Sequence, residues 1–330
     1  MTNRSEACRS QYFTCIVAGV ALACGSAAAQ DVGYPSRTVQ IVVPYSTGTT
    51  ADILARLLGP KLSERWKVSV ITDNRPGATG AIGIASVAKT APDGHTLMFV
   101  PTSFAMISAV YGKLPFDPVS SFAPVALLAT SPLAFVVHPQ LPARSVREFV
   151  QLAKRRPGEL YYSSPGNGSA QHLVMELFKL ETGINVVHVP HKGLAGAISD
   201  VMGGHVQAII ASLQTVHPCV TGGRLRMLAV LRAERSPAFR DVPTLKEQGL
   251  PQLEVETWYG ALAPAATPVP VIAKLNSDIN ALLQQPEVRE QLARQGMNPA
   301  GGTPERFAGL IRGELARWAR VVAAAKIKFD

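Results

Sequence analysis

Cysteine is scarce in this chain. Four cysteines occur in 330 residues, and three of them, Cys8, Cys15 and Cys24, lie in the first thirty positions. Removal of that segment would leave Cys219 alone, which excludes an intramolecular disulfide even in an oxidising compartment. Nothing near Cys219 suggests a nucleophile, so we expect a lone buried thiol without a catalytic role.

Apolar runs long enough to cross a membrane are also missing. The run at residues 14–24 is shorter than the roughly 20 apolar residues that a span needs, and no other run approaches that length. It follows Arg4 and Arg9 and precedes five small residues at 25–29, which together form the three parts of a secretory signal. We therefore predict a signal peptide over residues 1–29, cleaved after Ala29, and a soluble mature chain in the periplasm. A buried N-terminal helix and a lipoprotein signal at Cys24 are the alternatives.

Motifs for nucleotide, metal and nucleophilic chemistry are absent from the sequence. Residues 77–83 read G-x-x-G-x-x-G rather than G-x-G-x-x-G, and neither G-x-x-x-x-G-K-[ST] nor G-x-S-x-G occurs. His188-Val-Pro-His191 has the spacing of a metal pair, but Pro190 disturbs helical geometry and no C-x-x-C accompanies it. No second acid lies on a loop that matches Asp52. We therefore expect no catalytic residue, no metal and no cofactor.

The charge of the chain argues against a further class of partner. The net charge is +9, and removal of Arg4, Arg9 and Glu6 with the signal leaves +8. A basic surface favours anionic ligands or partners. Lys and Arg are scattered, however, and no basic stripe interleaved with aromatic residues occurs, so nucleic acid is a poor candidate. Solvated surface charge is the simplest interpretation.

Short β-branched runs alternate along the chain with segments of helical periodicity. The first unit shows the pattern, because a strand at 38–43 ends at Pro44 and apolar residues recur at helical spacing over 51–62. We predict further strands at 68–71, 96–100, 124–137, 160–163, 185–189, 206–211, 225–231 and 258–262. We predict further helices at 80–90, 145–155, 169–182, 196–202, 243–248, 269–283, 286–295 and 304–325. Repeated β-loop-α units predict an α/β fold of parallel sheets with helices on both faces.

The mature chain of about 300 residues is long enough for two cores rather than one, although no Pro/Gly-rich linker divides it. Two discontinuous, doubly wound lobes reconcile its length with its continuity. We assign residues 30–127 plus 232–330 to lobe 1 and residues 128–231 to lobe 2. Two extended crossings then form a two-strand hinge, and such a layout allows the lobes to close over a ligand.

Gly, Ser and Thr concentrate in four loops that follow predicted strands: residues 46–50, 77–80, 102–103 and 163–169. In open α/β sheets, ligands bind beyond the C-terminal ends of the strands, where loops lead into helices. The first N–H groups of a helix lack internal partners and carry the positive end of its dipole, so they hold a carboxylate or phosphate without Lys or Arg. Ordinary turn chemistry would explain any one loop, but four of them favour an anion-binding cleft.

Two side chains at these loops have more than one interpretation. Thr49 followed by Asp52 resembles a capping box, so that Asp52 would cap its own helix. Alternatively, Asp52 orients loop amides or accepts from an amine or hydroxyl of the ligand. His172, in the first turn of a predicted helix, either points a ring N–H at the cleft or caps the turn. We favour the cap for Asp52 and the cleft for His172.

The same loops carry a family resemblance. Pro44-Tyr-Ser-Thr-Gly48-Thr-Thr-Ala-Asp52-x-x-Ala55-Arg56 resembles the P-[FY]-x-x-G-G-x-x-D-x-x-A-R opening of the Bug receptors, the substrate-binding components of tripartite tricarboxylate transporters. Further matches include Asn74-Arg75-Pro76-Gly77-Ala78-x-Gly80, Ser163-Ser164-x-Gly166-x-Gly168-Ser169-x-x-His172-Leu173, Val189-Pro190-x-Lys192-Gly193 and Trp258-Tyr259-Gly260. The matches run in order over residues 34–310 at the spacing of the family.

The resemblance implies a type II periplasmic binding fold with a hinged cleft and no enzymatic activity. In that family, backbone amides and ordered waters of the first lobe clamp one carboxylate, and the second lobe faces the distal part of the ligand. On this sequence, the expected ligand contacts are Tyr45, Ser46, Thr47, Gly48, Thr49, Thr50, Asp52, Ala78, Thr79, Gly80, Thr102, Ser103, Ser164, Gly168, Ser169, His172, Lys192, Gly193, Leu194, Ala195 and Ser212. The implied partners are a small organic acid and two membrane subunits of a transporter, and we expect a monomer.

This sequence departs from the family pattern at several positions. Thr49 stands where the opening motif has its second glycine, and Ser46 and Thr47 give a more polar entrance. Gln207 and Ala211-Ser212 stand where relatives often carry an acid that receives an amine or hydroxyl of the ligand. These departures put amino-acid ligands in doubt and favour a plain acid, an aromatic one included.

Two other functions remain open at this point. Some family members feed a periplasmic signalling domain rather than a transporter. A secreted hydrolase would use His172 with Ser164 or Ser169, but it needs a base oriented by a third group, and the sequence offers none.

Overall fold

The first β-loop-α unit folds much as its sequence predicts. In the computed structural model, which describes residues 33–111, 113–236, 238–325 and 327, strand β1 spans Val39–Val43 and helix α2 spans Thr50–Trp66. β1 is buried along nearly its whole length, as expected of a β-branched run inside a parallel sheet. The predicted signal peptide, residues 1–29, lies outside the described residues. The elements of the fold all belong to one compact unit, Arg37–Asp330.

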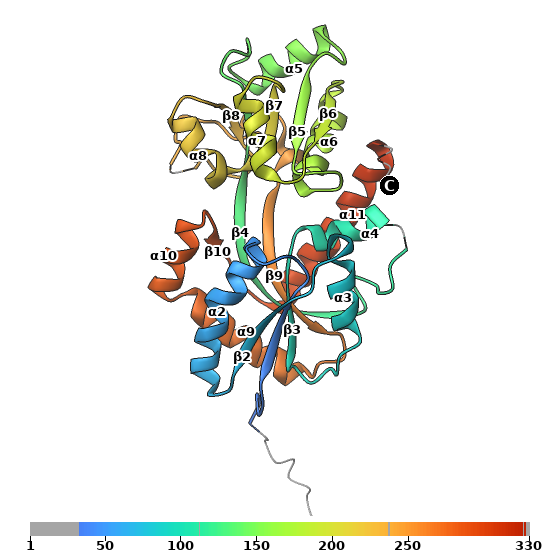
Figure 1. The fold of residues 1–330 in the computed structure, drawn as a ribbon, viewed down its shortest axis with the longest axis vertical. Coiled ribbons are helices and arrows are strands. Elements are labelled where there is room, and N and C mark those ends of the chain that lie inside the picture. Colours follow the sequence, from blue (N-terminus) through green and yellow to red (C-terminus); the bar gives the residue numbers. More distant parts are fainter. Residues whose placement is uncertain (1–32, 112, 237, 326, 328–330) are drawn as a thin grey trace, which may run out of the picture. The chain divides into compact units, whose positions relative to one another are not determined.

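The first lobe is built around a sheet with the strand order β2-β1-β3-β9-β4, and β10 also pairs with β4 (Figure 1). Its strands are β2 (Val70–Asn74), β3 (Thr96–Pro101), β9 (Glu256–Pro264), β10 (Asn298–Pro299) and the first part of β4 (Phe122–Val137) besides β1. β1 pairs in parallel with β2 and β3, whereas β9 runs antiparallel to β3 and β4. The helices are α2, α3 (Ala81–Ala88), α4 (Ser103–Tyr111), α9 (Val269–Leu283) and α10 (Pro286–Arg294). Phe104, Phe122 and Trp258 are among the buried residues of its core.

The second lobe continues from β4 in the order β4-β7-β5-β6, and β8 also pairs with β4. Its strands are β5 (Tyr161–Ser164), β6 (Val187–Pro190), β7 (Ala208–Ser212) and β8 (Arg226–Val230), and its helices are α5 (Val146–Arg155), α6 (Ala170–Thr182), α7 (Leu194–Met202) and α8 (Leu213–Thr221). β5 is parallel to β6 and β7. Phe135 and Val136, neighbours on β4, belong to different core clusters. Because adjacent strand residues point to opposite faces, this sheet carries a core on each side.

Two strands, β4 and β9, run between the lobes (Figure 1). β4 pairs with β9 as far as Pro132 and with β7 from Leu133 onward. The predicted architecture of two discontinuous α/β lobes joined by a two-strand hinge is therefore confirmed. The residue bounds of the lobes stay a prediction. Leu253 and Val255, which the sequence assignment places in lobe 1, lie in a core of the second lobe, which favours a return crossing that begins near residue 256.

Helix α11 (Pro304–Ala325) takes part in both lobes. Phe307 and Ile311 lie in the core of the first lobe, and Trp318 and Val321 lie in a core of the second. These four residues are spaced by four, seven and three positions, so they share one face of the helix. The C-terminal helix is thus a third element that connects the lobes.

The predicted elements agree with the structure apart from a few segments. The helix predicted at 243–248 is wrong. Thr244 and Glu247 exchange backbone-to-side-chain hydrogen bonds that close a single turn, and Gly249 then leaves the helical backbone at φ +85°. α4, α8 and β10 are not among the predicted elements. α4 is almost entirely apolar and shows little helical periodicity, while α8 contains Pro218 and β10 has only two residues.

Candidate functional site

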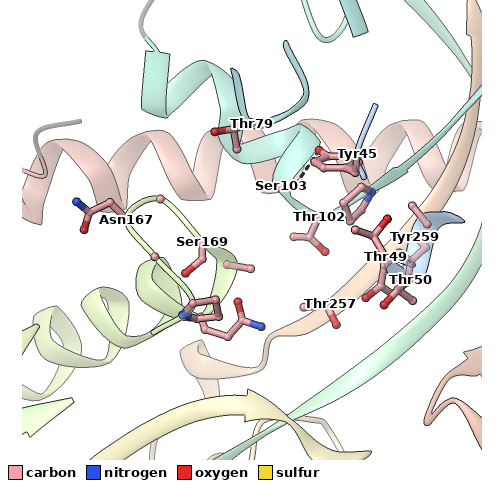
Figure 2. A pocket seen from close by; sticks show the side chains of 17 residues that line it. Tyr45, Thr49, Thr50, Thr79, Thr102, Ser103, Asn167, Ser169, Thr257 and Tyr259 are labelled. Atoms are coloured by element: carbon pink, nitrogen blue, oxygen red, sulfur yellow. Dashed lines mark hydrogen bonds between the residues drawn. The ribbon is translucent and has the colours of Figure 1, made fainter. Parts of the chain in front are cut away.

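A cavity of about 430 Å³ is lined by both lobes and by the crossing strand β9 (Figure 2). Its walls come from the loops after β1 and β3, from the short 3₁₀ turn η1 (Ala78–Gly80), from the loop after β5, and from β9. β1, β3 and β5 are strands of the parallel parts of the sheets, and each of these loops leads into a helix. The cavity therefore lies where the sequence predicts a ligand site, beyond the C-terminal ends of strands.

Part of the expected contact set lines this cavity and part does not. The lining includes eight of the expected residues: Tyr45, Thr49, Thr50, Thr79, Thr102, Ser103, Gly168 and Ser169. The expected residues outside the lining are Ser46, Thr47, Gly48, Asp52, Ala78, Gly80, Ser164, His172, Lys192, Gly193, Leu194, Ala195 and Ser212. The lining residues that were not expected are Ala51, Pro101, Pro165, Gly166, Asn167, Ala170, Gln171, Thr257 and Tyr259. The lining thus draws on the starts of α2, α4 and α6 and on β9, but not on the starts of α7 and α8.

Asp52 holds the first loop from behind the cavity. Its carboxylate is buried and accepts from the N–H of Gly48 (2.9 Å) and from Nε of Arg56 (3.0 Å). Burial raises the pKa of Asp52, but hydrogen bonds from Arg56 and Gly48 outweigh it, so the net pKa lies below its usual value. Thr49 donates its hydroxyl to the carbonyl of Ser46 (2.9 Å) and gives α2 no side-chain cap. The predicted capping box is therefore wrong, and the alternative, in which Asp52 orients a loop amide, is observed.

The first-lobe wall is held by hydroxyl pairs. The hydroxyls of Tyr45 and Ser103 lie 2.8 Å apart, and Figure 2 marks this hydrogen bond with a dashed line. Burial raises the pKa of Tyr45 to about 12, against the opposing effect of the Ser103 hydrogen bond. A Cβ at Gly80 would come within 3.1 Å of the Tyr45 ring, so the close approach of η1 to this ring favours glycine. The Thr79 hydroxyl lies 2.7 Å from that of Tyr111 at the rim.

The second-lobe wall is the loop that leads into α6. Gly166 and Gly168 adopt φ values of +144° and +73°, a region that favours glycine. Ser169 caps the helix, because its Oγ accepts from the N–H of His172 (3.3 Å). The next two residues, Ala170 and Gln171, line the cavity, and their N–H groups belong to the first turn, which has no internal carbonyl partner.

His172 does not face the cleft, which corrects the sequence-based expectation. Its side chain is 5% exposed, and its Nδ1 accepts from the N–H of Gly168 (3.1 Å). Its ring lies parallel to that of His188, with centroids 4.0 Å apart and planes 7° apart. The ring nitrogen nearest the loop is thus an acceptor, and the imidazole is packed inside the lobe behind the loop.

Strand β9 supplies a wall that the sequence analysis missed. Thr257 and Tyr259 line the cavity, while Trp258 between them packs edge-on against Phe307 with ring centroids 5.4 Å apart. The N–H of Trp258 donates to Oγ1 of Thr102 (2.6 Å), and that hydroxyl donates to the Trp258 carbonyl (3.2 Å). Burial raises the pKa of Tyr259. Strand alternation around the Trp258-Tyr259-Gly260 match was the signal that could have placed Thr257 and Tyr259 on one face.

The cavity is polar without being charged. Among the described residues that line it, none is Asp, Glu, Lys, Arg or His. In the described part of the chain, no group of three or more His, Cys, Asp and Glu side chains is placed to hold a metal. The described helices include none with the length and apolar character of a membrane span. An anion in this cavity would therefore bind to N–H groups and hydroxyls at the starts of α2, α4 and α6.

Comparison with known proteins gives a consistent result. Residues 54–327 match the family described as "Tripartite tricarboxylate transporter family receptor". The protein BugT of Bordetella pertussis is 36% identical over 299 residues, which cover 89% of this chain and 92% of BugT. The structure "R. palustris Rpa4515 with adipate" is 36% identical with a TM-score of 0.76, over 90% of this chain and 100% of that one. MatC (Rpa3494) from Rhodopseudomonas palustris, with bound malate, is 31% identical with a TM-score of 0.73, over 88% and 100% of the two chains.

These matches cover most of the two lobes, the hinge strands and the cavity loops. They also confirm the predicted type II periplasmic binding fold, since the similar structures include periplasmic binding proteins such as BugD. The chain therefore belongs to the family of tripartite tricarboxylate transporter receptors, the Bug receptors.

Proposed function

We propose that this chain is a non-catalytic receptor of the periplasm that binds a small carboxylate and delivers it to the two membrane subunits of a tripartite tricarboxylate transporter. In this proposal, residues 1–29 direct export and are cleaved after Ala29, and the mature protein works as a monomer. Adipate and malate, the ligands named for two similar structures, are the first candidates.

The observation that carries the proposal is a cavity lined by the first residues of three helices and by no ionised side chain. Thr50 and Ala51 of α2, Ser103 of α4, and Ala170 and Gln171 of α6 all contribute. Their free N–H groups and the helix dipoles place partial positive charge around the cavity. A carboxylate at each end of the cavity would meet a helix N-terminus from a different lobe, so the ligand itself would favour closure.

The same lining supports a preference for plain acids over amino acids. An ammonium group taken from water needs a carboxylate or several acceptors in return. No described acidic side chain lines the cavity, and Ser212, where relatives often have an acid nearby, lies outside the lining. A ligand with a positive charge would therefore lose hydration without a counter-charge.

The geometry gives little support to a hydrolase. Ser164 Oγ lies 2.7 Å from Nε2 of His188, which has the spacing of a nucleophile and its base. Ser164 is, however, fully buried and outside the cavity lining. Ser169 does line the cavity, but its hydroxyl caps α6. A role as sensor rather than transport receptor uses the same binding step, and a pull-down of partners from the periplasm separates the two.

A panel of acids matched in length tests the proposal. Adipate, hexanoate and 6-aminohexanoate share six carbons and differ only in the group at the far end. We expect adipate to raise the melting temperature, because a ligand at one hundred times its Kd adds about 2.7 kcal/mol to the stability of the folded state. We expect 6-aminohexanoate to bind more weakly than hexanoate. Preferential binding of 6-aminohexanoate or of neutral alcohols over adipate and hexanoate, or no effect of any organic acid including malate, would overturn the proposal.

A further inference from the structure

The loop that forms the second-lobe wall is held by side chains behind it. Ser164 Oγ accepts from the N–H of Gly166 (3.1 Å) and lies 3.1 Å from the carbonyl of the same residue. His172 Nδ1 accepts from the N–H of Gly168 (3.1 Å). Both glycines have a positive φ, and one backbone hydrogen bond lies within the loop, from the N–H of Ser169 to the Gly166 carbonyl (3.2 Å). The N–H groups of the two glycines are thus held by side-chain acceptors and not by backbone carbonyls.

The two acceptors are linked through a stack of rings. Tyr162, His188 and His172 lie one above another, with centroid distances of 4.8 Å between Tyr162 and His188 and 4.0 Å between the two histidines. His188 Nε2 lies 2.7 Å from Ser164 Oγ. A serine hydroxyl has one proton and two acceptor sites. All contacts of Ser164 are satisfied when it donates to the Gly166 carbonyl and accepts from Nε2–H of His188 and from N–H of Gly166.

We propose that His172 is a positioning residue of the ligand site: its neutral ring accepts the Gly168 N–H and so fixes the loop 165–169 in the shape that presents Asn167, Ala170 and Gln171 to the cavity. For the ligand, this inference rests on the proposed function. For the loop itself it rests on geometry alone. Protonation of the ring ends this arrangement, because Nδ1 then becomes a donor that faces the Gly168 donor at 3.1 Å.

The surroundings of the stack favour the neutral rings. Burial, and then the positive charge of Lys179, lower the pKa of His172 to about 4. Burial, and then His172, lower the pKa of His188 to about 4, with Glu176 acting in the opposite direction and Lys179 and His191 in the same one. Glu176 is occupied, since it accepts from the Tyr162 hydroxyl (2.5 Å) and from Lys179 Nζ (2.7 Å). The ring that holds the loop is thus neutral at neutral pH and is protonated only in acid.

Two substitutions separate the acceptor from the ring. His172→Asn keeps an acceptor oxygen close to the position of Nδ1, without a titrating ring. His172→Phe keeps a flat ring of similar size against His188 and removes the acceptor. His205→Asn changes a histidine whose side chain is 75% exposed and serves as the control.

The first measurement needs no ligand. Nuclear magnetic resonance of the purified protein labelled at histidine and glycine reports the ring tautomer of His172 and the exchange rate of the Gly168 amide. At pH 7 we expect the His172 tautomer with a proton on Nε2 and none on Nδ1, and a Gly168 amide that is protected from exchange. As the ring is protonated near pH 4, Nδ1 should gain a proton and the Gly168 amide should lose its protection. His172→Phe should expose the Gly168 amide, and His172→Asn should keep most of its protection. A proton on Nδ1 at pH 7, or a Gly168 amide equally protected in His172→Phe, would overturn the inference.

The second measurement adds adipate as the probe. We expect His172→Phe to weaken adipate binding about tenfold, since an unsatisfied buried N–H is unfavourable, and His172→Asn and His205→Asn to stay within about threefold. Binding by the unaltered protein should weaken as the pH falls through about 4, and binding by His172→Asn should weaken less. Equal affinities of all three variants for adipate would contradict the role in binding. If the unaltered protein binds no acid, the proposed function fails, while the ligand-free measurement still decides the role of His172.

Discussion

A negative charge introduced at one residue that lines the cavity gives a direct test of carboxylate binding. Gln171 lines the cavity in the first turn of α6, and its side chain is only partly buried. Gln171→Glu has almost the same shape and adds one negative charge. Because acidic residues are favourable in the first turn of a helix, the fold should not be weakened. The charge therefore acts on the ligand and not on stability.

The size of the effect follows from the size of the cavity. A sphere of 430 Å³ has a diameter of about 9 Å, which we take as the typical distance between a charge on the cavity wall and a carboxylate inside the cavity. At an effective dielectric constant of about 20, two like charges about 9 Å apart repel by roughly 1.8 kcal/mol, which corresponds to a loss of affinity of about twentyfold. Isothermal titration calorimetry with the acid that binds best in the length-matched panel measures this loss directly.

Two further substitutions complete this test. Gln171→Met is neutral and of similar length, and we expect its affinity to stay within about threefold of the unaltered protein. Gln171→Lys should strengthen binding of a carboxylate, since the sign of the interaction is reversed. If Gln171→Glu binds the acid as tightly as the unaltered protein, or if Glu and Lys at this position weaken binding equally, the cavity does not recognise its ligand by negative charge.

Three other predictions concern the fold around the site. Asp52→Ala should lower the free energy of unfolding by about 1.5–3 kcal/mol, measured by urea denaturation, because charged hydrogen bonds to a loop amide and to a guanidinium are lost. Gly260→Ala should lower it by about 1–3 kcal/mol, because the new Cβ would lie 2.0 Å from the buried Phe307 ring. Stability should also fall as the pH drops from about 6.5 to 4. In that range His172 and His188 bind protons in the unfolded state but not in the folded state, because folding lowers their pKa values. The free energy of unfolding should therefore fall by up to about 2.7 kcal/mol per pH unit for the pair.

Controls and contrary outcomes are available for each of these. Gly309→Ala changes an exposed glycine of α11 with open space around it and should stabilise the protein by up to about 1 kcal/mol. Equal effects of the Gly260 and Gly309 substitutions would contradict the packing argument. An Asp52→Ala protein within about 0.5 kcal/mol of the unaltered one would show that the loop has no need of its carboxylate. The double variant His172→Asn, His188→Asn is the control for the pH dependence. If the stability of the unaltered protein stays as constant from pH 6.5 to 4 as that of the double variant, the two histidines do not contribute to the pH dependence.

The alternation of strands and helices was predictable because each element carries its own local signal. β1 is a β-branched run closed by Pro44, and α5 and α6 begin at serines whose hydroxyls cap them. The two-strand hinge was predictable because the chain is long enough for two lobes and no Pro/Gly-rich linker divides it. α4 was missed because a helix that is apolar on nearly all sides has no polar face to give it a period.

The site was predictable as a set of loops and only partly as a set of side chains. Local sequence places Thr49 and Ser169 at helix starts and Ser103 on a loop after a strand, and these residues line the cavity. It does not say whether a side chain turns toward the cavity or behind it. That choice depends on tertiary contacts, as for His172 of α6, which stacks on His188 of strand β6. The inclusion of Thr257 likewise requires the pairing of β9 with β4, which is distant in sequence.

The way in which α11 is anchored bears on how this receptor moves. Phe307 and Trp318 sit in different cores but on one continuous helix. A helix without an internal proline or a bulge resists a sharp bend, so α11 is a stiff connection beside the two hinge strands. Closure is then easiest as a rotation of one lobe about the axis of α11, because any other motion must bend the helix or displace one of its ends within a packed core. The range of lobe movement is set in part by α11, and none of its described residues lines the ligand cavity.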